Sequence, residues 1–553
     1  MAGSQRRRCL CVSLALLALI AVVILCGSLL GRQSCSVGLF KRGAVAADSG
    51  TCSKIGRDIL QQGGSAVDGA IAALLCTSII NPQSMGLGGG SIFTVREKSG
   101  RVRVIIARET TPVGARADLL KECPLKGKTD SQWIGIPGEL RGYEWVHQRY
   151  GRLTWASLFQ PTIRLARQGV PLSPIMNRFQ EFHELEETSP LRKLFSHKNN
   201  TLLKVGDTVK FEKLADTLEI IAKEGASAFY TGPLAKDLVQ DVRDAGGTLS
   251  MEDLKSYTVK DVDPWSIKVG DYTMYFPPPP SGGAFLSFIL NIMKGFNLDS
   301  FSILGKQKTL TYHRYIEACK FANSRRSDIR DPAFVSDKNA FQMTTEELAD
   351  RVRLMISSNR TYDLSYYNIT PSGDQVGTTH LSVLDEEGTA VSVTSSINNV
   401  LGSKIYSPKT GVILNNQLRD FCGYADSIST GERPPSSMTP AIFLSETSSR
   451  MLLIGASGGS MILAGVAQTI MNHLWFGMNL KDAISTPIVY VDQKNTVKFE
   501  PKFDQNVSKA LEALGHTVGN QSYFYNVVNA ISKVGPCIEA VSDSRKLGEA
   551  AGY

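Results

Sequence analysis

The chain has few histidines and no cluster of potential metal ligands. Only seven histidines occur among its 553 residues, and they are scattered along the sequence. Structural and catalytic zinc sites are normally built from closely spaced Cys and His side chains. The sequence therefore predicts no catalytic metal.

A dinucleotide-binding loop and a nucleic-acid-binding surface are also missing. The glycine-rich run 86–90 follows an expected helix and precedes an expected strand at 92–95, the reverse of the order that a dinucleotide loop requires. The net charge is +8, but the basic residues are dispersed, and the sequence contains no internal repeat or long low-complexity stretch. We expect neither a cofactor nor a nucleic-acid partner.

An apolar segment lies at the N-terminus of an otherwise ordinary globular composition, 42% apolar and 20% charged. Residues 9–31 carry no charge, and as a helix they would span about 34 Å, enough to cross a hydrocarbon core of about 30 Å. The three arginines at 6–8 favour a cytoplasmic N-terminus. We expect a cytoplasmic tail (1–8), a transmembrane signal-anchor (9–31) and an extracellular body, as in a single-pass type II protein of the plasma membrane. A cleaved signal peptide is the alternative, although its apolar region is usually only about 7–15 residues long.

Sequons and cysteines agree with a body outside the cytosol. We expect glycans at five N-x-[ST] sequons, namely Asn199, Asn359, Asn368, Asn506 and Asn520. Of the ten cysteines, three lie in or beside the apolar segment. The other seven are an odd number, so at least one thiol is left free or intermolecular, and the sequence alone leaves their pairing open.

Short periodic segments predict a mixed α/β fold. Residues 64–68 have the pattern of a capping box that opens an apolar helix. Strands are expected at 102–106 and 452–454, and helices at 285–293 and 312–322. In the stretch 377–398, Leu381, Val383, Val391 and Val393 alternate with polar residues around a turn at 385–388, which predicts a β-hairpin with one buried face.

The threonine at the head of this hairpin could act as a nucleophile. Cleavage of the Gly377–Thr378 bond would free the α-amine of Thr378. An α-amine has a pKa of about 7.7–8, so a substantial fraction is neutral near neutral pH, whereas a lysine with a pKa of about 10.4 is almost fully charged. The free amine could therefore take the proton from the threonine hydroxyl. On this segment alone, the simpler interpretation is that Thr378 and Thr379 only fill strand positions.

Further segments resemble the gamma-glutamyltransferase (gamma-glutamyl transpeptidase) family over nearly the whole chain. They are SMGLGGG at 84–90, ARE at 107–109, the Thr378 hairpin, LNNQ at 414–417, PSSM at 435–438, GASGG at 455–459, SDSRKLG at 542–548 and AGY at 551–553. Residues 81–84 and 276–280 look most like the type 5 branch, the leukotriene-C4 hydrolases. The resemblance implies the four-layer αββα sandwich of N-terminal nucleophile hydrolases. It also implies one precursor, cut between Gly377 and Thr378 into a large chain (ectodomain 32–377) and a small chain (378–553) that stay together as a heterodimer.

The resemblance also implies a role for each motif residue. Thr378 would attack the Gly377 carbonyl during self-cleavage, and later the γ-amide carbonyl of a substrate, giving an acyl-enzyme. The backbone of Gly458 and Gly459 matches the family's oxyanion hole, and Ser396 stands where the family places a threonine beside the nucleophile. The family's recognition of a γ-glutamyl group matches Arg108, Ser436 and Ser437 for its carboxylate, and Asn398, Gln417 and Asp420 for its ammonium. A disulfide between Cys52 and Cys76 is likewise implied.

The implied substrates are γ-glutamyl compounds, above all glutathione and its S-conjugates such as leukotriene C4, which would become leukotriene D4. Water would release glutamate, and an amino acid or dipeptide would accept the γ-glutamyl group. The segment 421–435 looks shorter than in many relatives, which favours a pocket open to bulky S-conjugates. Gln417 replaces the glutamate usual in mammalian members, but its amide oxygen can still accept from an ammonium.

Two alternatives remain from the sequence. The segment 455–459 is formally G-x-S-x-G between a strand and a helix, the setting of an α/β-hydrolase nucleophile elbow, with Ser457 as nucleophile. Such an enzyme needs a downstream histidine, and only His473 and His516 follow. The second alternative is a membrane glycoprotein that has the fold without the chemistry.

Overall fold

The computed structural model describes residues 35, 38–123, 130–179, 185–368, 377–520 and 526–553. The predicted cytoplasmic tail and signal-anchor lie outside these residues. Among the residues described, no helix combines the length and the apolar character needed to cross a bilayer.

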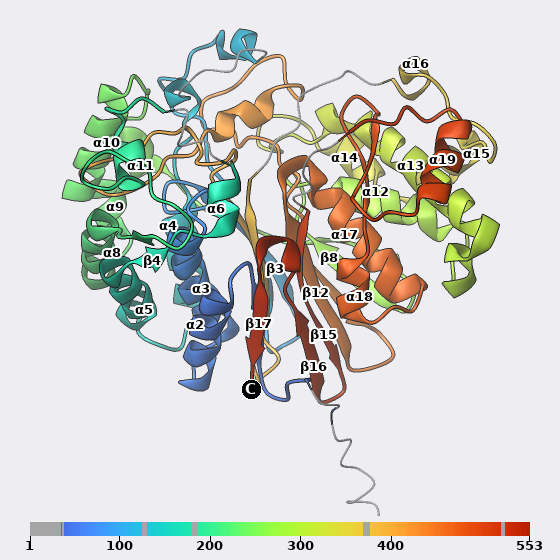
Figure 1. Cartoon of the computed structure of the whole chain (residues 1–553), viewed down its shortest axis with the longest axis horizontal. Helices are drawn as coiled ribbons and strands as arrows, with labels where there is room; N and C mark the ends of the chain where they lie inside the picture. The colour runs from blue at the N-terminus through green and yellow to red at the C-terminus, as the bar shows by residue number, and fades with distance from the viewer. Residues whose placement is uncertain (1–34, 36–37, 124–129, 180–184, 369–376, 521–525) are drawn as a thin grey trace, which may run out of the picture.

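Two antiparallel sheets form the centre of the molecule (Figure 1). The first sheet has the order β17 (Glu549–Gly552), β1 (Ala44–Ala47), β9 (Thr379–Leu384), β10 (Ala390–Ser396), β2 (Gly90–Arg96), β3 (Val102–Ala107) and β6 (Lys260–Val262). The second has the order β16 (Cys537–Val541), β15 (Val527–Val534), β12 (Arg450–Ser457), β11 (Ala441–Ser445), β8 (Tyr272–Phe276) and β7 (Trp265–Val269). The sheets face each other where β9 and β10 pack against β12 and β15.

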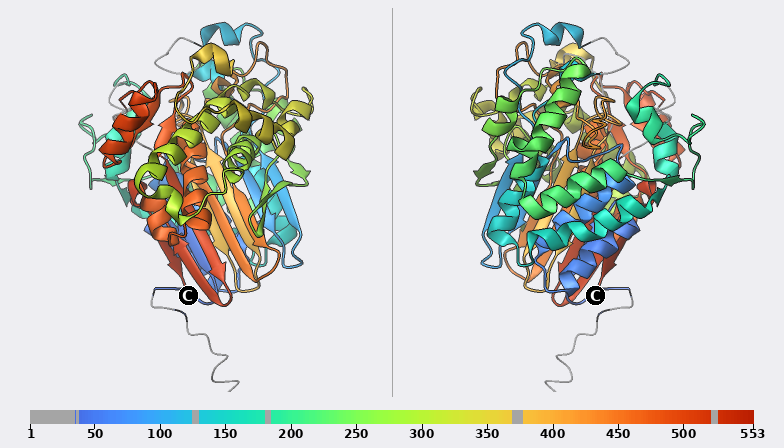
Figure 2. Two further views of the ribbon diagram at one scale, coloured as in Figure 1. Left: turned by 90° about the vertical axis from the view of Figure 1, so that its right-hand side faces the viewer. Right: turned by 90° about the vertical axis from the view of Figure 1, so that its left-hand side faces the viewer.

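Helices cover the outer face of each sheet, as the views in Figures 1 and 2 show. On the outer side of the first sheet, α2 (Gly50–Gln61), α3 (Ala66–Ile80) and α4 (Glu139–Tyr150) pack directly on the strands. Farther along this side lie α5 (Trp155–Gln168), α8 (Glu212–Glu224), α9 (Ser227–Thr231), α10 (Pro233–Asp244) and α11 (Met251–Ser256), which pack mainly on other helices. On the second lie α12 (Gly283–Lys294), α13 (Gly305–Asn323), α15 (Glu346–Met355), α17 (Ile462–Ile470), α18 (Leu480–Ser485) and α19 (Gln505–Ala513). The arrangement is α-β-β-α, so the predicted mixed α/β class is confirmed.

Smaller elements complete the described chain. They are α6 (Pro174–Phe179), α7 (Pro190–Leu194), α14 (Lys338–Gln342), α16 (Leu364–Tyr367), β4 (Val170–Pro171), β5 (Thr208–Val209), β13 (Val489–Val491) and β14 (Val497–Phe499). They lie in the connections between the larger helices and strands.

The predicted β-hairpin is present as β9 and β10, with one correction. Every residue of both strands is buried, so the hairpin has two buried faces and not one. The reason is its place in the sandwich: α3 packs on one face of the hairpin and β12 on the other. Its polar side chains lie in the interior and form hydrogen bonds there. The Ser392 hydroxyl, for example, donates to the Ile454 carbonyl at 3.2 Å.

Helix α3 begins as predicted. Ser65 accepts from the Asp68 backbone amide at 3.1 Å, and Asp68 accepts from the Ser65 amide at 2.9 Å, which is a capping box. The helix is apolar on all sides because it packs on the first sheet, between the neighbouring helices α2 and α4 and beneath α5.

Three disulfides are present among the described cysteines. Cys52–Cys76 joins α2 to α3 and confirms the implied pair. Cys35–Cys537 and Cys123–Cys422 each join a residue before position 377 to one after it. Cys319 is the free, buried thiol that the odd count requires.

Candidate active site

Four segments meet at the Gly377–Thr378 peptide bond. The Gly458 N–H donates to the Gly377 carbonyl at 3.0 Å, and the Thr378 N–H donates to the Ser84 carbonyl at 3.2 Å. The Thr378 hydroxyl lies 3.0 Å from the Ser396 hydroxyl, which also accepts from the Asn398 amide at 2.8 Å. The Gly377 carbonyl therefore accepts a hydrogen bond from a backbone N–H, and the Thr378 hydroxyl belongs to the residue on the other side of the same peptide bond.

The backbone around this bond is strained and crowded. Thr378 has φ of +84°, a conformation that a β-branched residue rarely adopts, and such a residue costs of order 1–3 kcal/mol. At Gly377 a Cβ atom would lie 1.7 Å from the Asn398 carbonyl oxygen, so only glycine fits. Cleavage would release Thr378 from this constraint.

Two glycines position the backbone N–H that donates to the Gly377 carbonyl. Gly458 and Gly459 follow β12 with φ of +118° and +57°, in the left-handed region that favours glycine. They turn the chain from the end of β12 into a short 3-10 turn and then α17. The turn places the Gly458 N–H on the Gly377 carbonyl.

A buried ion pair supports the threonine from the other side. The Lys546 ammonium donates to the Thr378 carbonyl at 2.8 Å and to the Asp48 carboxylate at 2.6 Å, and both side chains are fully buried. Asp48 also accepts from the Thr379 hydroxyl at 2.5 Å and from the Asn529 amide at 2.7 Å. Sequence reasoning missed this pair: Lys546 lay in a matched motif without an assigned role, and nothing in the pattern marked Asp48.

A pocket beside Thr378 collects the predicted binding residues. It is lined by Thr378, Ser396, Arg108, Asn398, Gln417, Asp420, Ser436, Ser437 and Gly459. Residues to which the sequence analysis gave no role also line it, namely Tyr424, Pro435, Met438, Ser460, Ile462 and Gln493. The structure thus brings together residues from positions 108 to 493.

Arg108 and Asp420 form an ion pair in this pocket. Arg108 is fully buried and also donates to the Pro434 and Pro435 carbonyls at 3.2 and 2.9 Å. Its Nη1 has no hydrogen-bond partner among the described residues, although Glu109 lies 3.6 Å away. Burial raises the pKa of Glu109 to about 8, which leaves this carboxyl largely protonated near neutral pH. Among the described residues, Arg108 therefore keeps one N–H group, on Nη1, without a hydrogen-bond acceptor.

The residues predicted for the ammonium lie around Asp420. Gln417 donates its amide N–H to Asp420 at 2.6 Å, while its amide oxygen has no partner among the residues described. Asn398 donates to the Asn416 carbonyl at 3.0 Å. Burial raises the pKa of Asp420, although Arg108, Gln417 and Asn398 oppose the shift. A carboxylate and an unused amide oxygen are suitable acceptors for an ammonium.

The nearby histidine is not a base for this threonine. His380 is fully buried between the two sheets, and its ring nitrogens contact the Thr394 and Ser382 hydroxyls at 2.9 and 3.2 Å. Burial lowers its pKa to about 3, so the ring is neutral. The free α-amine that cleavage would create remains the base that the chemistry requires.

The α/β-hydrolase alternative is wrong. Ser457 is fully buried at the end of β12, and its hydroxyl has no hydrogen-bond partner among the described residues. Of the downstream histidines, His473 contacts the Met478 carbonyl at 2.8 Å, and His516 contacts His313 at 2.7 Å. Neither forms the nucleophile–histidine pair that this mechanism needs.

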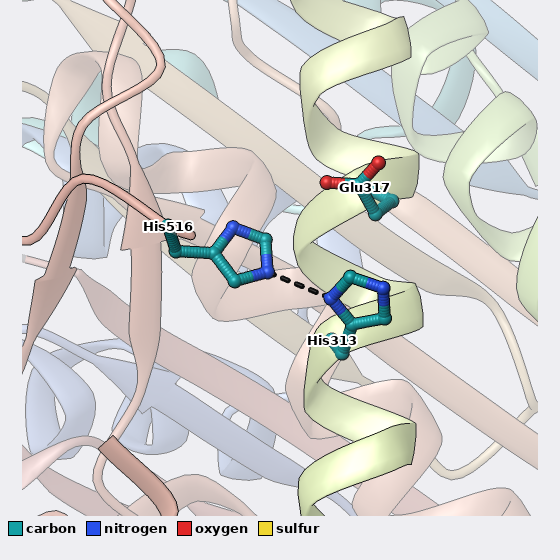
Figure 3. A group of neighbouring side chains, drawn as sticks. All are labelled: His313, Glu317 and His516. Carbon is teal, nitrogen blue, oxygen red and sulfur yellow. Dashed lines mark hydrogen bonds between the residues drawn. The ribbon is translucent and has the colours of Figure 1, made fainter. Parts of the chain in front are cut away.

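His313, Glu317 and His516 form a buried group whose ligand atoms are close enough to hold a metal ion (Figure 3). Hydrogen bonds account for the group instead. His313 donates from Nε2 to the Ser357 carbonyl at 2.7 Å and accepts at Nδ1 from His516 at 2.7 Å, and Lys320 donates to His516 Nδ1 at 3.0 Å. Burial lowers the pKa of both rings, to about 2 for His516, so both rings are neutral. The ring nitrogen that carries a lone pair in each, Nδ1, already accepts a hydrogen bond. The group ties α13 to the segment after α19.

Comparisons with known proteins give the family of this chain. A family model described as Gamma-glutamyltranspeptidase matches residues 52–553. Glutathione hydrolase 5 proenzyme of Rattus norvegicus is 46% identical over 97% of each chain, and that of Homo sapiens 44% over 94% of each. Among solved structures, cephalosporin acylase from Bacillus halodurans matches with a TM-score of 0.83 at 25% identity, covering 94% of this chain and 97% of that one. Gamma-glutamyltranspeptidase of Helicobacter pylori matches with a TM-score of 0.53 at 26% identity, covering 60% and 95%. The chain belongs to the gamma-glutamyltranspeptidase family.

Proposed function

We propose that this protein is a self-processing γ-glutamyl hydrolase and transferase that cleaves the γ-glutamyl amide of glutathione and its S-conjugates. The observation that carries the proposal is the contact at the Gly377–Thr378 bond. Its carbonyl accepts from the Gly458 N–H at 3.0 Å, and the Thr378 hydroxyl stands beside it. The family membership and the relatives called glutathione hydrolase 5 proenzyme support it.

Self-cleavage begins with Thr378. Its hydroxyl oxygen attacks the Gly377 carbonyl carbon, the C–N bond breaks, and the nitrogen takes a proton. The Gly458 N–H stabilises the oxyanion; removing one such donor typically costs about 2.7–4 kcal/mol of transition-state stabilisation. Water then hydrolyses the ester, which leaves a carboxylate on Gly377 and a free amine on Thr378. The products are a large chain that ends at residue 377 and a small chain of residues 378–553.

Substrate turnover uses the same atoms. The free amine of Thr378 takes the hydroxyl proton, and the oxygen attacks the γ-carbonyl of the substrate. The γ-amide C–N bond then breaks, and the leaving amine departs with the proton that the α-amine had taken. Cleavage separates Gly377 from the site, so the Gly458 N–H, together with Gly459, becomes available to the new oxyanion. Water then completes hydrolysis, or an amino acid or dipeptide amine completes transfer.

Substrate binding replaces the ion pair between Arg108 and Asp420 with two ion pairs, one from each of these residues to the substrate. The α-carboxylate of the γ-glutamyl group takes the place of Asp420 on Arg108, with Ser436 and Ser437 beside it. The α-ammonium then binds the released Asp420, with Gln417 and Asn398 as further acceptors. The exchange keeps every buried charge paired, which favours a zwitterionic ligand over a simple carboxylic acid.

Leukotriene C4 belongs to the proposed substrates, with leukotriene D4 as its product. The segment 421–435 carries Tyr424 into the pocket wall and is fixed at one end by Cys123–Cys422. We infer that a segment this short leaves room beside the pocket for the leaving half of the donor.

We place the catalytic body outside the cell, anchored by residues 9–31 in the plasma membrane with residues 1–8 in the cytoplasm. All five sequon asparagines, Asn199, Asn359, Asn368, Asn506 and Asn520, are exposed. Exposed sequons can carry glycans without disturbing the core, which supports this placement.

Expression of the full chain tests the proposal. Reduced material should contain a fragment that begins Thr-Thr-His-Leu, and the protein should release p-nitroaniline from L-γ-glutamyl-p-nitroanilide. It should also convert leukotriene C4 to leukotriene D4, while Thr378→Ala remains one chain and does neither. A wild type that stays uncleaved and inactive would instead support the noncatalytic glycoprotein.

A further inference from the structure

A second pocket adjoins the one that holds Thr378. The two pockets share Ser460, and the second is lined mainly by apolar residues of α12, α13 and α17 and of the strand β13. Its lining includes Phe285, Ile289, Ala322, Leu463, Ala464, Tyr490 and Val491. Ser460 lines both pockets. Arg326 lines the second pocket and donates to the Tyr424 hydroxyl, which belongs to the wall of the Thr378 pocket.

Arg326 is a buried cation with neutral partners. It is only 6% exposed, and its guanidinium donates to the Asn323 amide oxygen, at 3.0 Å from Nη2, and to the Tyr424 hydroxyl. No carboxylate of the described residues forms an ion pair with it. A buried charge without a counter-ion is unfavourable, and a guanidinium fork suits a carboxylate. Because Tyr424 lines the Thr378 pocket, Arg326 faces the border between the two pockets.

Gln493 supplies a second unused group on the same side. Its amide nitrogen donates to the Ser460 hydroxyl at 3.2 Å, and its amide oxygen has no partner in the described part of the chain although the residue is 3% exposed. Gln493 lines the Thr378 pocket together with Ser460 and Gly459. An amide oxygen there can accept from the N–H of an amine near the acyl carbon.

We propose that Arg326, Gln493 and Ser460 form the subsite for the leaving half of the donor and, after it departs, for the acceptor. The ligand is an amino acid or dipeptide with a free carboxylate. Arg326 binds the carboxylate and Gln493 accepts from the amine, while the second pocket, with a volume of about 20 Å³, is too small for a side chain and forms the apolar wall beside Arg326. This inference rests on the proposed transferase function and deepens it.

In the transfer step, the acceptor amine takes the place of Thr378 on the γ-glutamyl group. The neutral amine of the acceptor attacks the carbonyl of the γ-glutamyl ester on Thr378. A C–N bond forms, the C–O bond to Thr378 breaks, and the proton that the amine loses passes to the threonine oxygen. Gln493 orients the amine, while Arg326 holds the other end of the acceptor.

The experiment compares two acceptors that differ only in the carboxylate. Full-length protein is supplied with L-γ-glutamyl-p-nitroanilide and either L-methionine or L-methioninamide, and transfer and hydrolysis products are quantified. For Arg326→Gln we expect the kcat/KM for methionine, relative to that for methioninamide, to fall at least about tenfold from its wild-type ratio, as loss of a charged hydrogen bond predicts. The different basicity of the two amines cancels, because each variant is compared with the wild type on the same pair.

Arg325→Gln is the matched control. Arg325 is next in the chain, but its partner is Asp328 at 3.4 Å and it does not line either pocket, so the ratio should stay at the wild-type value. Gln493→Leu should lower transfer relative to hydrolysis for both acceptors alike. If Arg326→Gln remains uncleaved on a gel, Gln493→Leu decides the inference.

Three results would overturn the subsite. They are an unchanged methionine to methioninamide ratio in Arg326→Gln, an equal drop in Arg325→Gln, and an unchanged ratio of transfer to hydrolysis in Gln493→Leu. A wild type that releases no p-nitroaniline would instead overturn the proposed function itself, so the two failures are distinguishable.

Discussion

The Gly377–Thr378 bond has two features that fit the proposed self-cleavage. Its carbonyl already has an N–H donor, and the positive φ of Thr378 is a strain that only a cut in the chain releases. The sequence predicted the nucleophile and the two glycines, since they stand in recognisable motifs. It could not predict the strain or the donor's orientation, which depend on how residues 84, 398 and 458 converge in the fold.

Gly377→Ala should abolish self-cleavage. A Cβ atom at this position would lie 1.7 Å from the Asn398 carbonyl oxygen, so the scissile carbonyl must move away from the Gly458 N–H. Gly86→Ala is the matched control, because a Cβ atom there meets nothing within 4 Å. A reducing gel measures the cleaved fraction; efficient cleavage of the alanine variant at 377 would contradict the proposed geometry.

Lys546→Met should destabilise the protein and slow its processing. The substitution leaves Asp48 fully buried without its cation, and breaking a buried pair typically costs about 3–5 kcal/mol. The Thr378 carbonyl also loses a donor. Urea unfolding, followed by fluorescence, measures the free energy of unfolding, and Lys494→Met, at an exposed position, provides the comparison. Similar unfolding of both variants would show that the pair contributes little.

At the scale of elements, the hairpin β9–β10 carries the nucleophile because it lies in the middle of the sandwich. Its alternating apolar residues predicted two strands and their turn correctly. The burial of its polar face was not predicted, because nothing local shows that a second sheet covers that face. His380 illustrates the difference, since in sequence it is one polar residue of a strand and in the fold it packs against Gly455 of β12.

The buried histidine on β9 should make the sandwich acid-sensitive. Burial lowers the pKa of His380 from about 6.5 to about 3, so below pH 6.5 the unfolded chain binds a proton that the folded chain does not. Stability is therefore complete above pH 6.5 and falls as the pH drops towards the folded-state pKa. At pH 5 the loss from one such group is about 2 kcal/mol.

His380→Gln should reduce this acid sensitivity. The difference in the free energy of unfolding between pH 7.5 and pH 5 should shrink by about 2 kcal/mol relative to the wild type. Gln160→Ala, at an exposed position without a titratable side chain, serves as the control and should leave the difference unchanged. An unaltered pH dependence in His380→Gln would show that this imidazole takes up no proton on unfolding in that range.

At the scale of the whole molecule, both halves of the chain contribute to each sheet. In the first sheet β9 and β10 lie between β1 and β2, and in the second β11 and β12 lie between β15 and β8. Strands from both halves are hydrogen-bonded side by side in each sheet, so a cut at residue 377 would leave the two halves joined through the sheets. The resemblance implied this interlocking, but the sequence left open the bridges between the halves, because seven cysteines allow many pairings.

Cys35–Cys537 and Cys123–Cys422 both cross the predicted cleavage point, so the processed halves should be covalently joined. Without reductant, a denaturing gel should show one band near the mass of the whole chain, and with reductant two bands should appear. Cys35→Ser or Cys422→Ser alone should keep the single band, because one bridge remains, and only the double variant should separate into two. Cys52→Ser removes the bridge between α2 and α3 within the large half, so it controls for the loss of a disulfide as such. Two bands from the unreduced wild type would mean that shared sheets alone hold the halves together.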